Sequence, residues 1–182
     1  MSDPVTLDRA TFLDVMTTFP TGVAIVTTTD AEGLPYGFTS NAVSSVSADP
    51  PMLLVCVALS SRTLPVLLDR GAFLVNFMGE GTVEACNLFA SKAEPQEKFA
   101  AIEWALRADR LPHLHRDGIA YASCRVEHTL EAGSHVVVVA RIVEGAVTDP
   151  NRRPIAYYKR QYGSWPVDPA GRSRLSRPDA GR

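Results

Sequence analysis

Residues 23–47 read VAIVTTTDAEGLPYGFTSNAVSSVS, a stretch that holds two strand patterns and the turn between them. Val23 to Thr29 is apolar and largely β-branched, as expected of a buried strand. Asp30 to Gly33 has the composition of a tight turn. We therefore expect the polar segment after the turn to return beside the first strand as its antiparallel hairpin partner.

The rest of the chain mixes strand patterns with short helical ones. Apolar residues recur at helical spacing from Leu7 to Phe19, and Pro20 ends that pattern, so an N-terminal helix should stop near Phe19. A late hairpin is expected to turn at Glu131-Ala132-Gly133. The other predicted elements are strands 52–59, 72–77, 121–129 and 134–147 and helices 63–68 and 82–89. This order favours a mainly β fold with short helices, an antiparallel barrel closed by hairpins, over β-α-β units.

Composition limits the class of protein. The 182 residues are 46% hydrophobic and 21% charged, which suits one globular domain with a buried core. From Gly163 onward the sequence is rich in Pro, Gly, Ser and Arg, so we assign 1–162 to the domain and 163–182 to a flexible C-terminal tail. The formal net charge of −2 offers no basic field, which argues against nucleic acid as a partner.

Cysteine usage and hydropathy indicate the compartment. Cys56, Cys86 and Cys124 are widely spaced and form no C-x-x-C pair, so they fit reduced core thiols better than a zinc site or a disulfide framework. No apolar run approaches the roughly 20 residues that a membrane helix needs, and the N-terminus lacks the apolar region of a signal peptide. We expect a cytoplasmic protein with no membrane partner.

The segment from Tyr36 to Ser47 carries short polar side chains where a strand normally carries bulky apolar ones. Thr, Ser and Asn let a flat ligand with polar edges approach the backbone closely and offer it hydrogen bonds. The segment therefore indicates a ligand wall. The alternative is an edge strand or a serine-rich surface loop, which is the commoner meaning of such a segment taken alone.

A second candidate site is Ser60-Ser61-Arg62-Thr63, directly after the predicted strand that ends at Leu59. Hydroxyl groups, a guanidinium and the free N–H groups of a helix start form a small anion cradle that suits a phosphate. The alternative is that Ser and Thr act here as ordinary helix N-caps.

Histidines supply the remaining candidates. His135 lies at the mouth of the late hairpin, where it can donate a hydrogen bond to a ligand or act near neutral pH, although a surface histidine is the alternative. His113 and His115 have the spacing of a metal pair but lie in a proline-containing loop without a third ligand, so we interpret them as exposed loop residues. The sequence contains no glycine-rich nucleotide motif, no nucleophile elbow and no paired carboxylates suited to acid–base work.

Taken in order, the motifs resemble those of the short-chain flavin reductase family, the FMN-binding split-barrel reductase components of two-component flavin-dependent monooxygenases. The similarity extends from Phe12 to Tyr162. It rests on Phe19-Pro20-Thr21-Gly22-Val23, Gly37-Phe38-Thr39-Ser40-Asn41-Ala42, Ser45-Val46-Ser47 before Asp49-Pro50-Pro51, Ser60-Ser61-Arg62-Thr63, Phe73-Leu74-Val75-Asn76, Lys98-Phe99, Gly133-Ser134-His135 and Tyr157-Tyr158. The resemblance implies an antiparallel split β-barrel, a homodimer with flavin near the subunit interface, FMN or FAD as the flavin, and NADH or NADPH as the hydride donor.

The resemblance also implies roles for the matched residues. Those implied to line the isoalloxazine are Thr39, Ser40, Asn41 and Ala42. Those implied to meet the ring and ribityl chain are Ser45, Val46 and Ser47, and those implied to hold the phosphate are Ser60, Ser61, Arg62 and Thr63. Phe99 would cover the flavin, Tyr158 would belong to the flavin-binding set, and His135 would face the nicotinamide as the catalytic residue. The family's usual motif there is Gly-Asp-His, so Ser134 leaves His135 without its neighbouring carboxylate.

The implied reaction passes hydride directly from nicotinamide C4 to flavin N5. It needs ring stacking and a short donor–acceptor distance, but no nucleophile, metal ion or Rossmann fingerprint. The sequence therefore predicts an NAD(P)H:flavin oxidoreductase that supplies reduced flavin to a partner monooxygenase. Two alternatives stay open, namely a non-catalytic flavin-binding or electron-carrier protein on the same barrel and a pyridoxamine-phosphate oxidase-like enzyme. The preferences between FMN and FAD and between NADH and NADPH also stay open.

Overall fold

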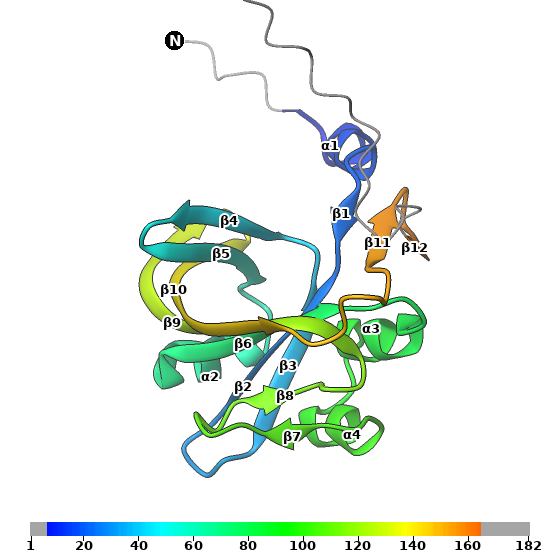
Figure 1. Ribbon diagram of the computed structural model, residues 1–182. Helices are drawn as coiled ribbons and strands as arrows, with labels where there is room; N and C mark the ends of the chain where they lie inside the picture. Colours follow the sequence, from blue (N-terminus) through cyan, green and yellow to red (C-terminus); the bar gives the residue numbers. More distant parts are fainter. Residues whose placement is uncertain (1–6, 165–182) are drawn as a thin grey trace, which may run out of the picture.

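The computed structural model describes residues 7–164, and its main element is a seven-stranded antiparallel sheet with strand order β3-β2-β6-β9-β10-β5-β4. Its strands are β2 (Ala24–Thr29), β3 (Pro35–Ser40), β4 (Val43–Ala48), β5 (Pro51–Ala58), β6 (Ala72–Met78), β9 (Gly118–Ala132) and β10 (His135–Val147). Figure 1 shows this sheet curving round into an open barrel. The two edge strands are β3 and β4, and the chain passes from one to the other through Asn41 and Ala42. The predicted mainly β, antiparallel fold is confirmed.

Smaller elements surround this sheet. A three-stranded sheet contains β1 (Thr21–Gly22), β11 (Ile155–Tyr158) and β12 (Gln161–Ser164), and a two-stranded one contains β7 (Ala105–Leu106) and β8 (Pro112–His113). The helices are α1 (Arg9–Thr17), α2 (Thr63–Arg70), α3 (Val83–Ala90) and α4 (Pro95–Ala100). Within residues 7–164, none of these helices has the length and apolar character needed to cross a bilayer.

Strand β2 is buried on both faces, which explains why its sequence, AIVTTT, is β-branched after Ala24 and does not alternate between apolar and charged residues. The buried hydroxyls of its threonines donate to backbone carbonyl oxygens. Ala24 and Val26 belong to the barrel core, which also receives Leu64 and Leu67 from α2. Ile25 belongs to a second core on the other face of the sheet. The residues of that second core include Cys86 and Phe89 of α3, Phe99 of α4 and Leu114. The helices thus cover β2 from opposite sides.

The two hairpins test the predicted turns. The first is confirmed, since Thr29 of β2 pairs with Pro35 of β3 across the predicted turn. The second turn is shorter than predicted, because β9 continues through Ala132, which pairs with His135. Gly133 adopts a φ of +61°, a left-handed conformation that glycine tolerates without strain. Gly133 and Ser134 therefore form a two-residue turn. The predicted turn at Glu131-Ala132-Gly133 is wrong for Glu131 and Ala132, which still belong to β9.

The C-terminal boundary also differs from the prediction. Gly163 and Ser164 pair with Ala156 and Ile155, so β12 continues past the predicted end of the domain at Tyr162. Backbone pairing extends this short strand although its composition is poor in apolar residues. The remaining predicted tail, 165–182, lies outside the described residues.

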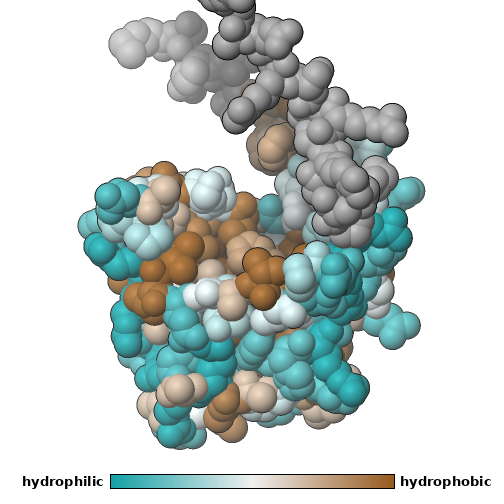
Figure 2. Space-filling model, viewed as in Figure 1, coloured by the Kyte–Doolittle hydropathy of each residue, from teal (hydrophilic) through white to brown (hydrophobic). Residues whose placement is uncertain are grey.

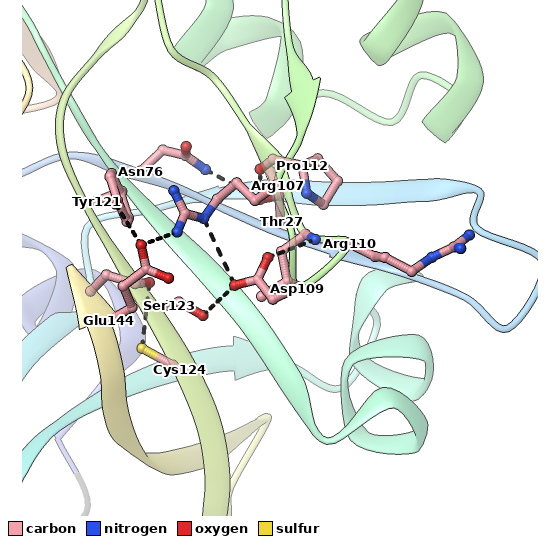
Figure 3. Close-up of polar contacts among 12 residues, drawn as sticks. Thr27, Asn76, Arg107, Asp109, Arg110, Pro112, Tyr121, Ser123, Cys124 and Glu144 are labelled. Atoms are coloured by element: carbon pink, nitrogen blue, oxygen red, sulfur yellow. Dashed lines mark hydrogen bonds and ion pairs between the residues drawn. The ribbon is translucent and has the colours of Figure 1, made fainter. Parts of the chain in front are cut away.

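A polar cluster ties the β7–β8 segment to the large sheet (Figure 3). The Arg107 guanidinium lies 4.1 Å from the centre of the Tyr121 ring and pairs with the carboxylate of Glu144 on β10. On β9, the Ser123 hydroxyl donates to Asp109 Oδ2 at 2.8 Å. Cation–π and charge-assisted contacts together fix the segment to two strands of the sheet.

The histidines of this segment differ in their surroundings. His115 is exposed, as predicted. His113 is half-buried with its ring centre 4.8 Å from that of Tyr121, so the prediction of an exposed loop residue is wrong for it. Within the described part of the chain, no group of three or more His, Cys, Asp or Glu side chains is arranged to hold a metal ion.

Candidate functional site

A cleft of about 330 Å³ opens beside the edge strand β3. Its walls come from the end of β3, from β5, from the start of α2, from the C-terminal end of α3 with the following loop, from α4 and from the first residue of β10. The predicted site residues that line it are Thr39, Ser40, Asn41, Ala42, Ser60, Ser61, Arg62, Thr63 and His135. The fold therefore brings together the predicted ligand wall, the predicted anion cradle and the predicted histidine, which are far apart in the sequence.

The polar side chains of the wall have two different tasks. Thr39 Oγ1 donates to the carbonyl oxygen of Cys86 at 2.7 Å, and Ser40 Oγ accepts from the Ala42 N–H at 3.1 Å. These two side chains shape the wall, because one holds α3 against β3 and the other fixes the bend after β3. Asn41 is exposed beside them, so its amide is available to a ligand.

Gly37 sets how closely α3 approaches the wall. A Cβ at this position would lie 2.9 Å from the ring of Phe89 and 3.0 Å from the carbonyl oxygen of Val26. The first contact is closer than real Cβ atoms come and the second is tight, so a larger residue would force Phe89 or the β2 backbone to shift. Glycine therefore lets Phe89 cover β3 closely. Phe89 itself lines the cleft.

The cradle at the start of α2 combines serine side-chain contacts with a cation that is already paired inside the protein. Ser61 Oγ accepts from the Thr63 N–H at 3.3 Å, a local bond from the residue before the N-cap. The N-cap itself is Arg62, whose side chain makes no capping hydrogen bond, so the interpretation of Ser and Thr as N-caps is wrong here. Arg62 reaches in another direction, toward the loop before α4. Its Nη1 pairs with Glu94 at 2.5 Å, and its Nη2 donates to the carbonyl oxygens of Lys92 and Ala93 at 2.6 and 2.8 Å.

The charge of the cleft is positive. The ionised side chains among its described lining residues are Arg62, Lys92 and Lys98, and no Asp or Glu belongs to this lining. Lys98 is only 6% exposed, and its Nζ donates to the carbonyl oxygens of Phe89 and Ser91 at the end of α3. Burial lowers the pKa of Lys98, and the positive charge of Arg62 acts in the same direction while the carboxylate of Glu94 opposes it. An anionic ligand group would relieve this accumulation of positive charge.

Lys98 is a site residue that the sequence reasoning missed. Lys98-Phe99 is one of the matched motifs, so the sequence did point to this position. The role in flavin binding was assigned to Phe99, however, and not to Lys98. Phe99 is instead buried, with its ring 5.1 Å from Phe89 and 5.3 Å from Trp104 in edge-on contacts. Phe99 packs against Phe89 in the second core and does not belong to the cleft lining.

Other predicted flavin-binding residues also lie outside the cleft lining of the single chain. Ser45, Val46 and Ser47 are on the edge strand β4, where a bulge lies between Ser45 and Ser47. Tyr158 is on β11, in the three-stranded sheet, and is 45% exposed. Their role in flavin binding stays a prediction.

His135 is the first residue of β10 and pairs with Ala58 of β5 at the rim of the cleft. Its side chain is exposed, and its Nδ1 lies 3.0 Å from the hydroxyl oxygen of Ser134. The residue therefore has a hydrogen-bond partner, although the partner is a hydroxyl in place of the family's carboxylate.

The cysteines divide into two classes. Cys86 and Cys124 are buried, and burial raises the pKa of Cys86 to about 11 and that of Cys124 to about 12, as in core thiols. Cys56 is half-buried and lines the cleft. All three are free.

Comparison with known proteins decides the family. The family model of the flavin reductase like domain matches residues 16–166. The chain belongs to this family. It is similar to a flavin reductase (NADH) from Kitasatospora aureofaciens, with 39% identity over 166 residues that cover 91% of this chain and 86% of the relative. The resemblance inferred from the motifs is confirmed.

Two further relatives of this flavin reductase-like protein belong to monooxygenase systems. The reductase component of 4-nitrophenol 4-monooxygenase/4-nitrocatechol 2-monooxygenase from Rhodococcus opacus is 34% identical over 157 residues, 86% of this chain and 81% of the relative. The crystal structure of a nitrilotriacetate monooxygenase component B homologue from Mycobacterium thermoresistibile has a TM-score of 0.83 and 30% identity, covering 95% of this chain and 94% of that one. The fold of this crystal structure is the one described above.

Proposed function

We propose that the protein is an NAD(P)H:flavin oxidoreductase that reduces FMN or FAD and supplies the reduced flavin to a partner monooxygenase. The observation that carries the proposal is one cleft whose lining combines a wall of small polar residues, the cationic side chains of Arg62, Lys92 and Lys98, and His135 at the rim. The family membership and the named relatives support the same conclusion.

The residues present suit a flavin. The small side chains from Gly37 to Ala42 admit a flat ring close to the backbone, and Asn41 offers an amide to its polar edge. Arg62 and the start of α2 suit a phosphate. A bound flavin supplies the hydride-accepting position, and His135 is placed to orient the nicotinamide from the rim. The positive charge of Lys98 favours the anionic reduced form of the ligand.

The reaction class is tested by steady-state oxidation of NADH and NADPH with FMN, FAD and riboflavin added separately. Oxidation that depends on added flavin supports the proposal, and the six combinations reveal both preferences. A protein that binds flavin tightly but oxidises neither nicotinamide faster than free flavin does would instead be a flavin carrier.

Release of the product distinguishes a reductase component from a self-contained enzyme. After anaerobic reduction, ultrafiltration should recover reduced flavin in the filtrate, because delivery to another protein requires dissociation. Reduced flavin retained at one equivalent per chain would contradict the monooxygenase-supplying role.

We infer a homodimer from the uncovered apolar face of α1. None of its residues is buried within the described chain, and its exposed apolar side chains include Phe12, Val15 and Met16. A nine-residue helix is marginal alone in water, so such a face calls for a covering surface. Figure 2 shows apolar surface gathered in the hollow between this helix and the curved sheet, which a second copy can fill. Light scattering should give a dimer for the wild type and a smaller species for the double variant Phe12→Asp, Val15→Asp, whereas a dimer in both would contradict this interface.

A further inference from the structure

The guanidinium of Arg62 is held by the loop that leads into α4. Nη1 forms the ion pair with Glu94, and Nη2 carries both backbone contacts, to the carbonyl oxygens of Lys92 and Ala93. The side chains of Arg62 and Glu94 are 47% and 62% exposed. The contact is therefore accessible to solvent and to a ligand without rearrangement of the core.

This arrangement conflicts with two-point recognition of a phosphate. A guanidinium offers two forks of parallel N–H groups, one formed by Nη1 with Nη2 and the other by Nε with Nη2. Both forks include Nη2, whose N–H groups are used by the carbonyl oxygens of Lys92 and Ala93. Arg62 must therefore leave the loop before it can hold a phosphate through either fork.

We propose that Glu94 competes with the flavin phosphate for Arg62, so that flavin binding exchanges one ion pair for the other. The inference rests on the proposed function, which supplies the phosphate. Glu94 is the charged member of the loop contacts, and its chain neighbours Lys92, Ala93 and Pro95 line the cleft. Phosphate entry thus detaches Arg62 from a wall of the same cleft.

The exchange weakens the binding of phosphate-bearing flavins relative to a site in which Arg62 is free. Weaker binding means faster dissociation when the association rate is unchanged. This suits a protein whose product has to leave, and it makes Glu94 a residue that sets flavin residence time without touching the flavin.

The test is equilibrium titration with FMN and with riboflavin, which lacks the phosphate, followed by flavin fluorescence quenching. Glu94→Gln should tighten FMN binding by up to about fivefold, the range of an exposed ion pair, and leave riboflavin affinity unchanged. Glu97→Gln is the matched control, because it removes a carboxylate from the same helix start, where Glu97 accepts the Glu94 N–H at 3.2 Å. It should change neither affinity.

Two further variants separate competition from other effects. Glu94→Asp keeps the charge and the capping chemistry but shortens the reach to Arg62, so it should also tighten FMN binding and serves if Glu94→Gln does not fold. In the Arg62→Ala background, Glu94→Gln should give no gain, since a double-mutant cycle isolates the pair.

Several results would overturn the exchange. These are FMN binding that is unchanged or weaker in both Glu94 variants, an equal gain for riboflavin, or a full gain in the Arg62→Ala background, which would indicate simple charge repulsion. Riboflavin binding by the wild type reports the proposed function separately, because it does not involve Arg62. If the wild type binds riboflavin but the Glu94 variants leave FMN affinity unchanged, the exchange is rejected and the proposed function is not.

Discussion

The hydroxyl oxygen of Ser134 lies 3.0 Å from Nδ1 of His135, in the turn that joins β9 to β10. A carboxylate at this position would only accept a hydrogen bond and would select the tautomer with the proton on Nδ1. A hydroxyl can donate or accept, so Ser134 keeps the ring oriented but leaves either tautomer available. Ser134 therefore orients the ring of His135 without selecting its tautomer.

A positioning role for His135 predicts a split between binding and rate. His135→Ala should lower kcat/KM for NADH by about 10- to 100-fold while flavin affinity stays near the wild-type value, because misplacement of the hydride donor costs rate through geometry. Stopped-flow flavin reduction at saturating flavin measures the step directly. A flavin reduction rate in His135→Ala equal to that of the wild type would contradict the positioning role.

Substitution of Ser134 refines the same prediction. Ser134→Ala removes the orienting hydroxyl and should give a smaller loss than His135→Ala. Ser134→Asp supplies a carboxylate that favours the protonated ring, so the pH dependence of reduction should move to higher pH. Turnover that is unchanged in both Ser134 variants would show that Ser134 does not orient His135.

Asn41 should contribute to flavin binding and not to folding, because its side chain is exposed on the cleft wall. Asn41→Leu is expected to weaken FMN and riboflavin binding alike by about tenfold, the size of one lost ligand hydrogen bond. Fluorescence quenching measures the affinities, and circular dichroism checks the fold. Ser44→Leu, on exposed β4 outside the cleft lining, is the control. Equal affinities in wild type and Asn41→Leu would refute the assignment.

Arg62 should distinguish flavins by their phosphate. A charge-assisted hydrogen bond contributes roughly 1.5–3 kcal/mol, and the contacts that Arg62 gives up in the 92–94 loop reduce the net gain. Arg62→Ala should therefore weaken FMN binding by about tenfold and leave riboflavin nearly unchanged. Equal losses for both ligands would show that Arg62 acts on the whole site instead of the phosphate.

The local pattern of the sequence was enough to predict most elements. The strand from Val23 to Thr29 and its turn were recoverable because β-branched residues and turn residues act over a few positions. The long late hairpin was harder, since Glu131 and Ala132 are of types depleted in strands but continue a ladder that Gly133 allows to close tightly. Strand pairing decided the boundary there.

Site residues could be predicted where the position of the backbone alone brings them to the cleft. They were harder to predict where side-chain packing decides which residue faces the cleft. The wall, the cradle and His135 meet because each follows directly from a strand end. Lys98 and Phe99 are adjacent on α4, and only the packing of α4 decides which of them lines the cleft and which is buried. The engagement of Arg62 by Glu94 joins residues 32 positions apart and has no local signal.

Gly37 should be required for stability. Gly37→Ala places a methyl group against Phe89 and the Val26 carbonyl oxygen, so the free energy of unfolding should fall by about 1–3 kcal/mol, as for other overpacked sites. Gly22→Ala is a matched control, because nothing lies within 4 Å of a Cβ there. Urea unfolding compares the two. A Gly37→Ala variant as stable as Gly22→Ala would show that α3 can shift without cost.

His113 should make stability depend on pH below neutrality. Burial lowers the pKa of His113 from its ordinary value of 6.5, and the charges of Arg107 and His115 act in the same direction while Asp109 opposes them. Just below pH 6.5 the unfolded chain then binds more protons than the folded one, so stability is fully present above pH 6.5 and falls as the pH drops toward the lowered folded pKa. His113→Gln removes this titration, and urea unfolding at a series of pH values should give a flatter curve in that window. Wild type and variant losing stability in parallel would mean that the ring is accessible to protons in the folded state.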